Sequence, residues 1–249
     1  MPGRRIIDQF DACAGACRDL AALSALLDDA ARALGFQYFA LLHHASLALP
    51  GRGLIRLDSY PQGWAEELVS EDLVGVDPVH HACRRTSLGF AWDQLARYTS
   101  IGGAERAVLA RAARHGLGDG FTVPVNIPGE PPGSCSFAVR RGLELPRARL
   151  LSAEQLGIHA FEAARRLAGF CAKSACPRLS RRERQCLRLV AGGKTDTVIA
   201  QILGISPETA HHYVKSARAA YDVVSRAQLV ACGLRDSLVS YEEAIPPGR

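Results

Sequence analysis

The chain has 249 residues, of which 48% are hydrophobic, 22% charged and 6% aromatic, and its formal net charge is +5. This composition is typical of one large or two small globular domains and excludes a disordered or fibrous chain. No apolar run approaches the roughly 18–20 residues that span a bilayer, and Asp8 comes too early for a signal peptide. We therefore expect a cytoplasmic protein without membrane contact.

Up to about residue 170, apolar spacing and turn residues predict helices that alternate with strands. The predicted helices are residues 8–34, 61–70, a short segment after Pro78, 103–115 and 152–170. The predicted strands are residues 36–43, 53–59, 87–92, 120–127 and 134–140, the last two joined by the turn-rich residues 128–133. This order predicts an α+β fold, an α-β-α sandwich around a central antiparallel sheet.

Composition and charge then divide the chain. Residues 171–178 carry no periodic pattern and are predicted to link a domain at 1–170 to a second one at 179–240, followed by a disordered acidic tail at 241–249. Residues 1–177 hold 19 basic and 18 acidic side chains, whereas residues 178–235 hold ten and four. A basic module behind a neutral one favours a polyanion reader attached to a sensor or an enzyme, although a solvated basic face gives the same bias.

The second domain contains only helix signals. These are a capping box at Ser180 and Glu183, a stop at Gly192-Gly193, a cap at Thr195, the turn Gly204-Ile205-Ser206, and Pro207 at a first helical position. Two short helices joined by a glycine-containing turn predict a helix-turn-helix.

The helix that follows Pro207 has two distinct faces. Its apolar face repeats at helical spacing in Ala210, Tyr213, Val214, Ala217 and Tyr221. Its opposite face carries His211, His212, Lys215 and Arg218. Such a face is either solvated or inserted into the major groove of double-stranded DNA, and the agreement of caps, turn and charge favours DNA.

Several runs of this domain resemble the DNA-binding domain of LuxR-type transcriptional regulators. They are Leu179-Ser180-x-Arg182-Glu183-Arg184, Gly193-Lys194-Thr195, Ile199-Ala200, Leu203-Gly204-Ile205-Ser206 and Thr209. The resemblance implies an all-α domain of four helices. It also implies DNA contacts, to base edges from His211, His212 and Lys215 and to phosphates from Lys194, Thr209 and Arg218. Departures at Ala210, Tyr213 and Tyr221 mean that no operator sequence is implied.

The first domain lacks a requirement of the phosphoacceptor receivers that often precede such DNA-binding domains. A receiver needs a lysine near the end of its sheet, and all three lysines of this chain follow residue 172. Instead, another set of residues resembles the signature of quorum-sensing LuxR-type receptors, which bind acyl-homoserine lactones. It consists of Tyr60-Pro61-x-x-Trp64, Asp77-Pro78, Trp92, Gly116-Leu117, Gly120 and the strand around Ser136.

This second resemblance implies a role for each pocket residue. The Trp64 indole would donate to the lactone carbonyl, and the Asp77 carboxylate would accept the ligand amide N–H. Tyr60 and Ser136 would donate to the acyl carbonyl. Trp92 would pack over the lactone ring.

Leu68 stands where the family has a tyrosine along the acyl chain. The change predicts an altered acyl-chain specificity, and the alternative is a regulator that responds to a non-lactone signal or to no small molecule. The resemblance also implies a homodimer on a two-fold DNA site, formed through residues 152–170 and 226–234, and RNA polymerase as a partner.

No cofactor, metal or catalytic site is predicted. The eight cysteines include no C-x-x-C pair, and neither Cys13-x3-Cys17 nor Cys171-x4-Cys176 has a nearby histidine at structural-zinc spacing. An enzyme for small esters or lactones would need a nucleophile and a base, yet G-x-S-x-G is absent and the pairs His43-His44 and His80-His81 lack metal-ligand partners. We therefore expect a regulator and no enzyme.

Overall fold

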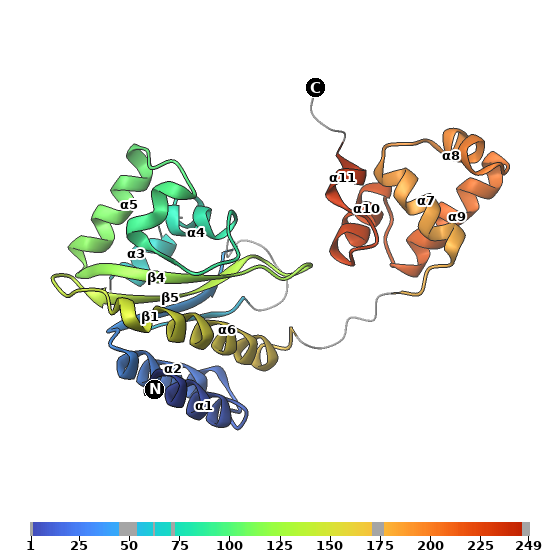
Figure 1. Ribbon diagram of the computed structural model, residues 1–249. Helices are drawn as coiled ribbons and strands as arrows, with labels where there is room; N and C mark the ends of the chain where they lie inside the picture. Colours follow the sequence, from blue (N-terminus) through green and yellow to red (C-terminus); the bar gives the residue numbers. More distant parts are fainter. Residues whose placement is uncertain (1, 45–53, 62, 71–72, 171–176, 246–249) are drawn as a thin grey trace. The chain divides into compact units, whose positions relative to one another are not determined.

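The computed structural model describes residues 2–44, 54–61, 63–70, 73–170 and 177–245 (Figure 1). The chain divides into two compact units, Met1–Ala172 and Lys173–Arg249, and each has its own hydrophobic core. Most of the predicted linker (171–176), the predicted strand start at residue 53 and the chain end (246–249) lie outside the described residues.

The described part of the first unit is built on a five-stranded sheet. The strands are β1 (Tyr38–His43), β2 (Arg56–Asp58), β3 (Phe90–Ala91), β4 (Leu117–Val125) and β5 (Gly133–Arg140). They lie in the order β2-β1-β5-β4-β3, and each neighbouring pair is antiparallel. The predicted antiparallel sheet is therefore confirmed.

Helices cover both faces of this sheet (Figure 1). One face carries α1 (Pro2–Ala14), α2 (Leu20–Leu34) and α6 (Leu150–Leu167). The other carries α3 (Trp64–Ser70), α4 (Pro78–Cys83) and α5 (Gly103–Arg114). Short 3-10 turns occur at η1 (Leu73–Gly75), η2 (Trp92–Arg97) and η3 (Arg147–Arg149). This arrangement confirms the predicted α-β-α sandwich.

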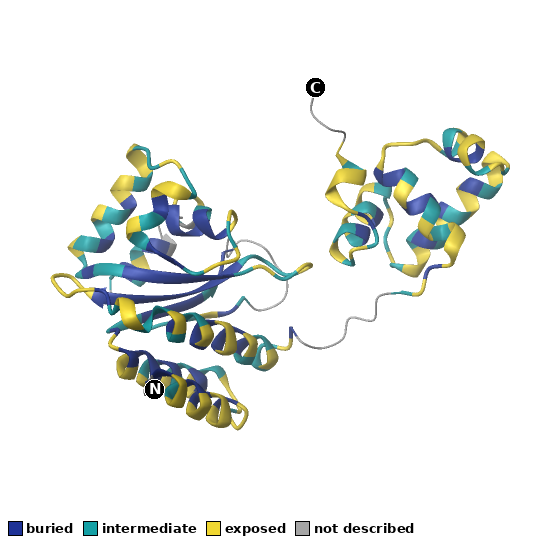
Figure 2. Ribbon diagram, in the orientation of Figure 1, coloured by how far each residue is buried: buried dark blue, intermediate teal, exposed yellow. Residues whose placement is uncertain are grey.

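Side chains alternate between the two sheet faces along each strand, as the period of two requires. The face under α1, α2 and α6 contributes to a large buried apolar core (Figure 2) that includes Phe10, Phe39, Phe121, Phe137 and Phe161. The opposite face is more polar and buries Thr122, Ser134 and Ser136. One face therefore serves packing, and the other can hold a ligand with polar groups.

The single helix predicted over residues 8–34 is wrong, because two helices cover this segment. α1 ends at Ala14, and α2 begins after Asp19, whose carboxylate accepts a hydrogen bond from the Ala22 backbone N–H at 2.8 Å. An aspartate N-cap is a strong helix start, although the apolar spacing continues across the break. The predicted strand at 87–92 is shortened to Phe90–Ala91, because Trp92 already begins η2.

The second unit is helical, as predicted. Its helices are α7 (Arg181–Ala191), α8 (Asp196–Leu203), α9 (Pro207–Ala220), α10 (Arg226–Arg235) and α11 (Tyr241–Ala244). The predicted disordered tail is wrong at its start, because Ser240 and Glu243 form a capping box that begins α11. Glu243 also lies 3.6 Å from the Arg188 guanidinium, so this short helix makes contact with α7.

Within the described ranges, no helix combines the length and the apolarity that crossing a membrane requires. In the same part of the chain, no three histidine, cysteine or acidic side chains are grouped so that they could hold a metal ion. The described cysteines are free thiols, and Cys83, Cys135 and Cys186 are buried.

Candidate functional site

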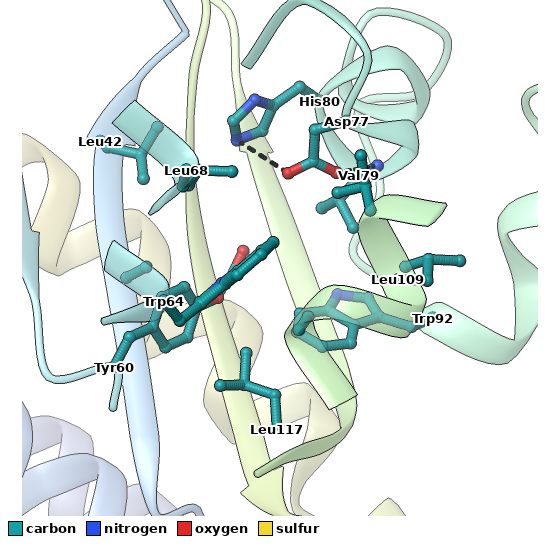
Figure 3. A pocket seen from close by; sticks show the side chains of 14 residues that line it. Leu42, Tyr60, Trp64, Leu68, Asp77, Val79, His80, Trp92, Leu109 and Leu117 are labelled. Atoms are coloured by element: carbon teal, nitrogen blue, oxygen red, sulfur yellow. Dashed lines mark hydrogen bonds and ion pairs between the residues drawn. The ribbon is translucent and has the colours of Figure 1, made fainter. Parts of the chain in front are cut away.

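A cavity lies between the polar face of the sheet and the helices α3, α4 and α5. It is lined by Ala40, Leu42, Tyr60, Trp64, Leu68, Asp77, Val79, His80, Trp92, Val108, Leu109, Ala112, Leu117 and Ser136 (Figure 3). This set includes all six residues that the sequence predicts to bind a ligand. The cavity volume is about 30 Å³, within about 450 Å³ of space that extends to solvent. The enclosed part holds about two water molecules, so a larger ligand must either displace lining side chains or extend into the open part of this space.

Local structure explains how residues of α3 and α4 reach the cavity. Trp64 is the first residue of α3, and Leu68 lies one turn later on the same face. Asp77 is the N-cap of α4, where its Oδ1 accepts a hydrogen bond from the Val79 backbone N–H at 2.8 Å. Pro78 occupies the first helical position, which needs no N–H donor. One carboxylate oxygen thus starts the helix while the side chain lines the cavity.

A chain of hydrogen bonds crosses the cavity floor. The Trp92 indole N–H donates to Thr122 Oγ1 at 2.8 Å, and the Thr122 and Ser136 hydroxyls share a hydrogen bond of 2.8 Å. Tyr60 and Ser136 both line the cavity. Burial, together with the nearby Asp77 carboxylate, raises the pKa of Tyr60, so the phenol keeps its proton. Because the Trp92 N–H is already used, this indole offers its ring face to a ligand.

A donor and an acceptor complete the polar lining. Trp64 is only 3% exposed, and its indole N–H has no hydrogen-bond partner among the described residues. Asp77 Oδ2 lies 3.7 Å from His80 Nε2, on the far side of the carboxylate from its capping bond. A buried N–H and a buried carboxylate in one small cavity suit a ligand that carries both a carbonyl and an N–H group.

His80 is a cavity residue that sequence reasoning misses. It lies three residues after Asp77, and this helical spacing is the signal that could have identified it. Its ring stacks on His44 with centroids 3.9 Å apart, and His44 Nε2 shares a 2.8 Å hydrogen bond with Ser134 Oγ.

The apolar wall of the cavity, which α5 provides through Val108, Leu109 and Ala112, is not predicted either. Helical spacing identifies the buried face of α5 but does not show that a cavity lies against it.

An ionic cluster joins α3 to α5 beside the cavity. Glu67 of α3 lies 3.1 Å from Arg111 Nη1 and 2.6 Å from His115 Nε2. The hydrogen bond from His115, with the charge of Arg111, holds the pKa of Glu67 below its ordinary value. The His115 ring also lies 5.9 Å from the Trp64 ring, between centroids. These contacts help to fix the helix that carries Trp64.

We expect Gly120→Ala to disrupt the cavity floor. A Cβ atom at Gly120 would lie 2.6 Å from the Trp92 ring, so the indole must shift and strain its bond to Thr122. The expected loss of stability is about 1–3 kcal/mol in urea unfolding followed by tryptophan fluorescence. Gly103→Ala is the control, because nothing lies within 4 Å of a Cβ there. Equal losses in both variants would contradict this account.

We also expect acid to destabilise the first unit through His44. Burial, with His80, Arg84 and His43 nearby, lowers the pKa of His44 well below 6.5. Below pH 6.5 the folded state therefore binds fewer protons than the unfolded chain, so stability decreases as the pH falls, by up to about 1.4 kcal/mol per pH unit.

Urea unfolding at about pH 7.5 and about pH 5.5 measures this dependence. His44→Gln should lose less stability on acidification than the wild type does. His81→Gln is the control and should behave like the wild type, because it replaces a half-buried histidine, next to His80 in the sequence. If His44→Gln leaves the pH dependence unchanged, His44 is not its source.

The second unit contains the predicted helix-turn-helix. Gly204 ends α8 with φ 65°, in the left-handed region that glycine adopts without strain. Ser206 then caps α9 by accepting a hydrogen bond from the Thr209 backbone N–H at 3.1 Å, and Pro207 occupies the first helical position. The side of α9 that packs inward buries Ala210, Val214 and Ala217. The local sequence thus determines both the turn and the orientation of the helix.

Four of the six predicted DNA contacts are exposed. His211, His212 and Lys215 share one exposed face of α9, and Lys194 is exposed before α8. Although exposed, His211 makes a hydrogen bond, because its Nδ1 lies 3.0 Å from Asp196 Oδ2. Five of the six predicted residues lie on α9, and three of them share its exposed face.

The other two predicted DNA contacts, Thr209 and Arg218, already make hydrogen bonds within the protein. Thr209 is half-buried, and its hydroxyl bonds to Ser206 Oγ at 3.0 Å. Arg218 is half-buried and donates from Nη1 to the Val224 carbonyl at 2.7 Å, which closes the turn between α9 and α10. Its Nε is buried without a hydrogen-bond partner among the described residues. Arg218 is thus partly engaged in the turn after α9, whereas His211 and Lys215 are exposed.

Comparison with known proteins matches both units. The family model described as "Autoinducer binding domain" covers residues 19–167, and that described as "Bacterial regulatory proteins, luxR family" covers residues 177–232. Among curated proteins, the transcriptional activator AhyR of Aeromonas hydrophila is 26% identical over 217 residues, 83% of this chain and 81% of AhyR. One relative thus spans both units.

Solved structures share the fold. SdiA of Escherichia coli in complex with octanoyl-rac-glycerol matches with a TM-score of 0.63 and 23% identity over 96% of each chain. The LuxR-family factor CepR2 of Burkholderia cenocepacia matches with a TM-score of 0.54 and 19% identity, over 65% of this chain and 94% of that one.

Proposed function

The chain belongs to the LuxR family of quorum-sensing transcriptional regulators, in which an autoinducer-binding domain is joined to a DNA-binding helix-turn-helix, and we propose that its signal is an N-acyl-homoserine lactone. Proteins of this family regulate transcription and are not enzymes. The observation that carries the proposal is the cavity, in which an indole N–H without a partner among the described residues lies together with a buried carboxylate. CepR2, which shares the fold, is described as dependent on such lactones.

In this proposal, each polar group of the cavity binds a different part of the ligand head group. The Trp64 N–H donates to the lactone carbonyl, and Asp77 accepts the amide N–H. The Tyr60 hydroxyl, supported by Ser136, donates to the acyl carbonyl, and Trp92 covers the lactone ring with its face. Because the enclosed part of the cavity is small, the ligand either moves these side chains as it binds or extends into the open part of the space.

Removing single donors tests these roles. Tyr60→Phe and Trp64→Phe should each weaken lactone binding roughly 2- to 10-fold, because a neutral hydrogen bond contributes about 0.5–1.5 kcal/mol. Tyr98→Phe is the matched control, since Tyr98 does not line the cavity and its ring packs against Phe90 instead. Titration of the purified protein with a lactone series measures the change. Unchanged affinity in both pocket variants would contradict the assignment.

A second candidate signal is an acyl compound without a lactone ring. Leu68 lines the cavity in place of the tyrosine that the family carries, which removes a hydroxyl next to the proposed acyl chain. E. coli SdiA binds octanoyl-rac-glycerol, an acyl ester that contains no lactone. The titration should therefore include this glycerol ester, and tighter binding of the ester than of every lactone would favour the second candidate.

The DNA-bound form that we propose is a homodimer on a two-fold site, cytoplasmic and in contact with RNA polymerase. Leu151 and Ile158 of α6 are 79% and 51% exposed and lie seven residues apart, which supports this helix as part of the dimer surface. DNA contacts come from the exposed face of α9 and from Lys194. Binding measured at several salt concentrations, with and without lactone, tests both the contacts and the response.

A further inference from the structure

We propose that Asp196 orients His211 so that this histidine reads a base edge, which makes an acidic side chain outside the recognition helix a determinant of DNA sequence preference. The inference rests on the proposed DNA binding by α9 and deepens it. Its subject is a positioning residue, because Asp196 acts through the histidine.

The geometry ties three elements together at one carboxylate. Asp196 is the first residue of α8, and its Oδ2 lies 3.0 Å from His211 Nδ1 on α9. Its Oδ1 accepts a hydrogen bond from Arg226 Nη1 at 2.6 Å, at the start of α10. Arg226 Nη2 donates to the Lys194 backbone carbonyl at 2.7 Å. Both oxygens of the carboxylate are therefore used, so its position is fixed from two sides.

The carboxylate is charged and compensated. Burial acts to raise the pKa of Asp196, but the hydrogen bonds from Arg226 and His211 outweigh it and place the pKa below its ordinary value. The guanidinium of Arg226 offsets the repulsion that a lone carboxylate would exert on DNA phosphates. An acid can therefore lie next to the DNA-binding face without abolishing binding.

The contact gives the His211 ring a direction. A carboxylate accepts only from a protonated nitrogen, so the ring proton lies on Nδ1 and Nε2 is left for another partner. The side chain is 62% exposed, beside the exposed His212 and Lys215. In a neutral ring Nε2 is an acceptor, and it fits the amino group of adenine N6 or cytosine N4 in the major groove. Without this contact, the His211 ring could carry its proton on either nitrogen, and it would discriminate less well between bases that offer a donor and bases that offer an acceptor.

The alternative is that Asp196 only stabilises the start of α8 and its bond to Arg226. In that case, replacing Asp196 changes affinity for every DNA sequence alike. Under the proposal, the change is confined to one base position, and that position is the one that His211 determines. A readout of base preference therefore separates the two roles, whereas total affinity does not.

The experiment is selection from a random double-stranded DNA library at about pH 8. It uses the full-length protein, purified with and without a series of N-acyl-homoserine lactones from hexanoyl to dodecanoyl. Wild type, His211→Ala, Asp196→Ala and Asp196→Asn are compared, and Asp236→Ala is the control, because it breaks an acid–arginine pair with Arg235 at the far end of α10. Thermal melting checks that each variant folds.

We expect the wild type to prefer adenine or cytosine at one position of each half-site. His211→Ala and Asp196→Ala should both reduce that preference, by about fivefold, and leave the other positions unchanged. Asp196→Asn should retain most of it, because the amide oxygen still accepts from Nδ1. Asp236→Ala should match the wild type.

Other outcomes overturn the proposal. These are a uniform change in affinity for Asp196→Ala, different positions affected by His211→Ala and Asp196→Ala, or guanine at the shared position. A wild-type protein that enriches no sequence, with or without lactone, would contradict the proposed DNA binding itself.

Discussion

Replacing Asp77 by asparagine is expected to weaken lactone binding by roughly 10- to 100-fold, because a hydrogen bond to a charged acceptor contributes about 1.5–3 kcal/mol. The variant keeps a side-chain oxygen that can accept from the Val79 N–H, so the cap of α4 is retained. What it loses is the negative charge, and its amide group presents a donor where the ligand N–H needs an acceptor. Isothermal titration with the tightest-binding lactone of a series measures the effect.

Asp19→Asn is the matched control for this prediction. Asp19 is also an aspartate N-cap, with its carboxylate 2.8 Å from the Ala22 N–H, but it starts α2 on the opposite face of the sheet. It should leave lactone affinity unchanged and shift stability no more than Asp77→Asn does. Equal affinity of the two variants would remove Asp77 from the ligand contacts.

Replacing Arg165 by methionine is expected to destabilise the first unit by about 3–5 kcal/mol, because it leaves a nearly buried carboxylate unpaired. Arg165 donates to Glu130 from Nε at 2.7 Å and from Nη2 at 2.5 Å, and the two side chains are only 12% and 10% exposed. This pair joins α6 to the turn between β4 and β5. Urea unfolding gives the change, and both tryptophans of the chain lie in this unit, so their fluorescence reports on it alone.

Two further variants separate the buried pair from an ordinary surface pair. Arg32→Met breaks the contact with Asp28, in which the Arg32 side chain is 59% exposed, and should cost far less stability than Arg165→Met, because solvent screens an exposed ion pair. Adding Glu130→Gln to Arg165→Met should restore part of the lost stability, since no buried charge remains. A loss of similar size for Arg32→Met and Arg165→Met would contradict the explanation.

Short-range signals predict the second unit well. The caps at Ser180, Thr195 and Ser206 and the left-handed turn at Gly204 act within a few residues, so the sequence alone locates the helices. Arg218 shows where this reasoning ends. Helical spacing places it on the outer face, but its long side chain folds back to the Val224 carbonyl, a contact that helical spacing does not encode.

The first unit is predicted in outline and less well in detail. Alternating apolar residues identify β4 and β5, but the break before Asp19 is hidden because apolar spacing runs through it. Cavity residues such as Trp64 and Ser136 are identified by resemblance to a family, since they come from separate elements. Only the antiparallel order of the strands brings them together. His80 shows the remaining gap: its spacing of three residues from Asp77 places it on the same helical face, but its stacking on His44 joins residues that are far apart in the sequence.

The central claim is that the cavity of the first unit holds an N-acyl-homoserine lactone. Its most direct test is native mass spectrometry of the full-length protein produced in cells supplied with a lactone series and octanoyl glycerol. We predict one lactone per chain in the wild type and in Asp19→Asn, and loss of the lactone from Asp77→Asn. A wild-type protein that carries no lactone, or an Asp77→Asn variant that retains it fully, would contradict the claim.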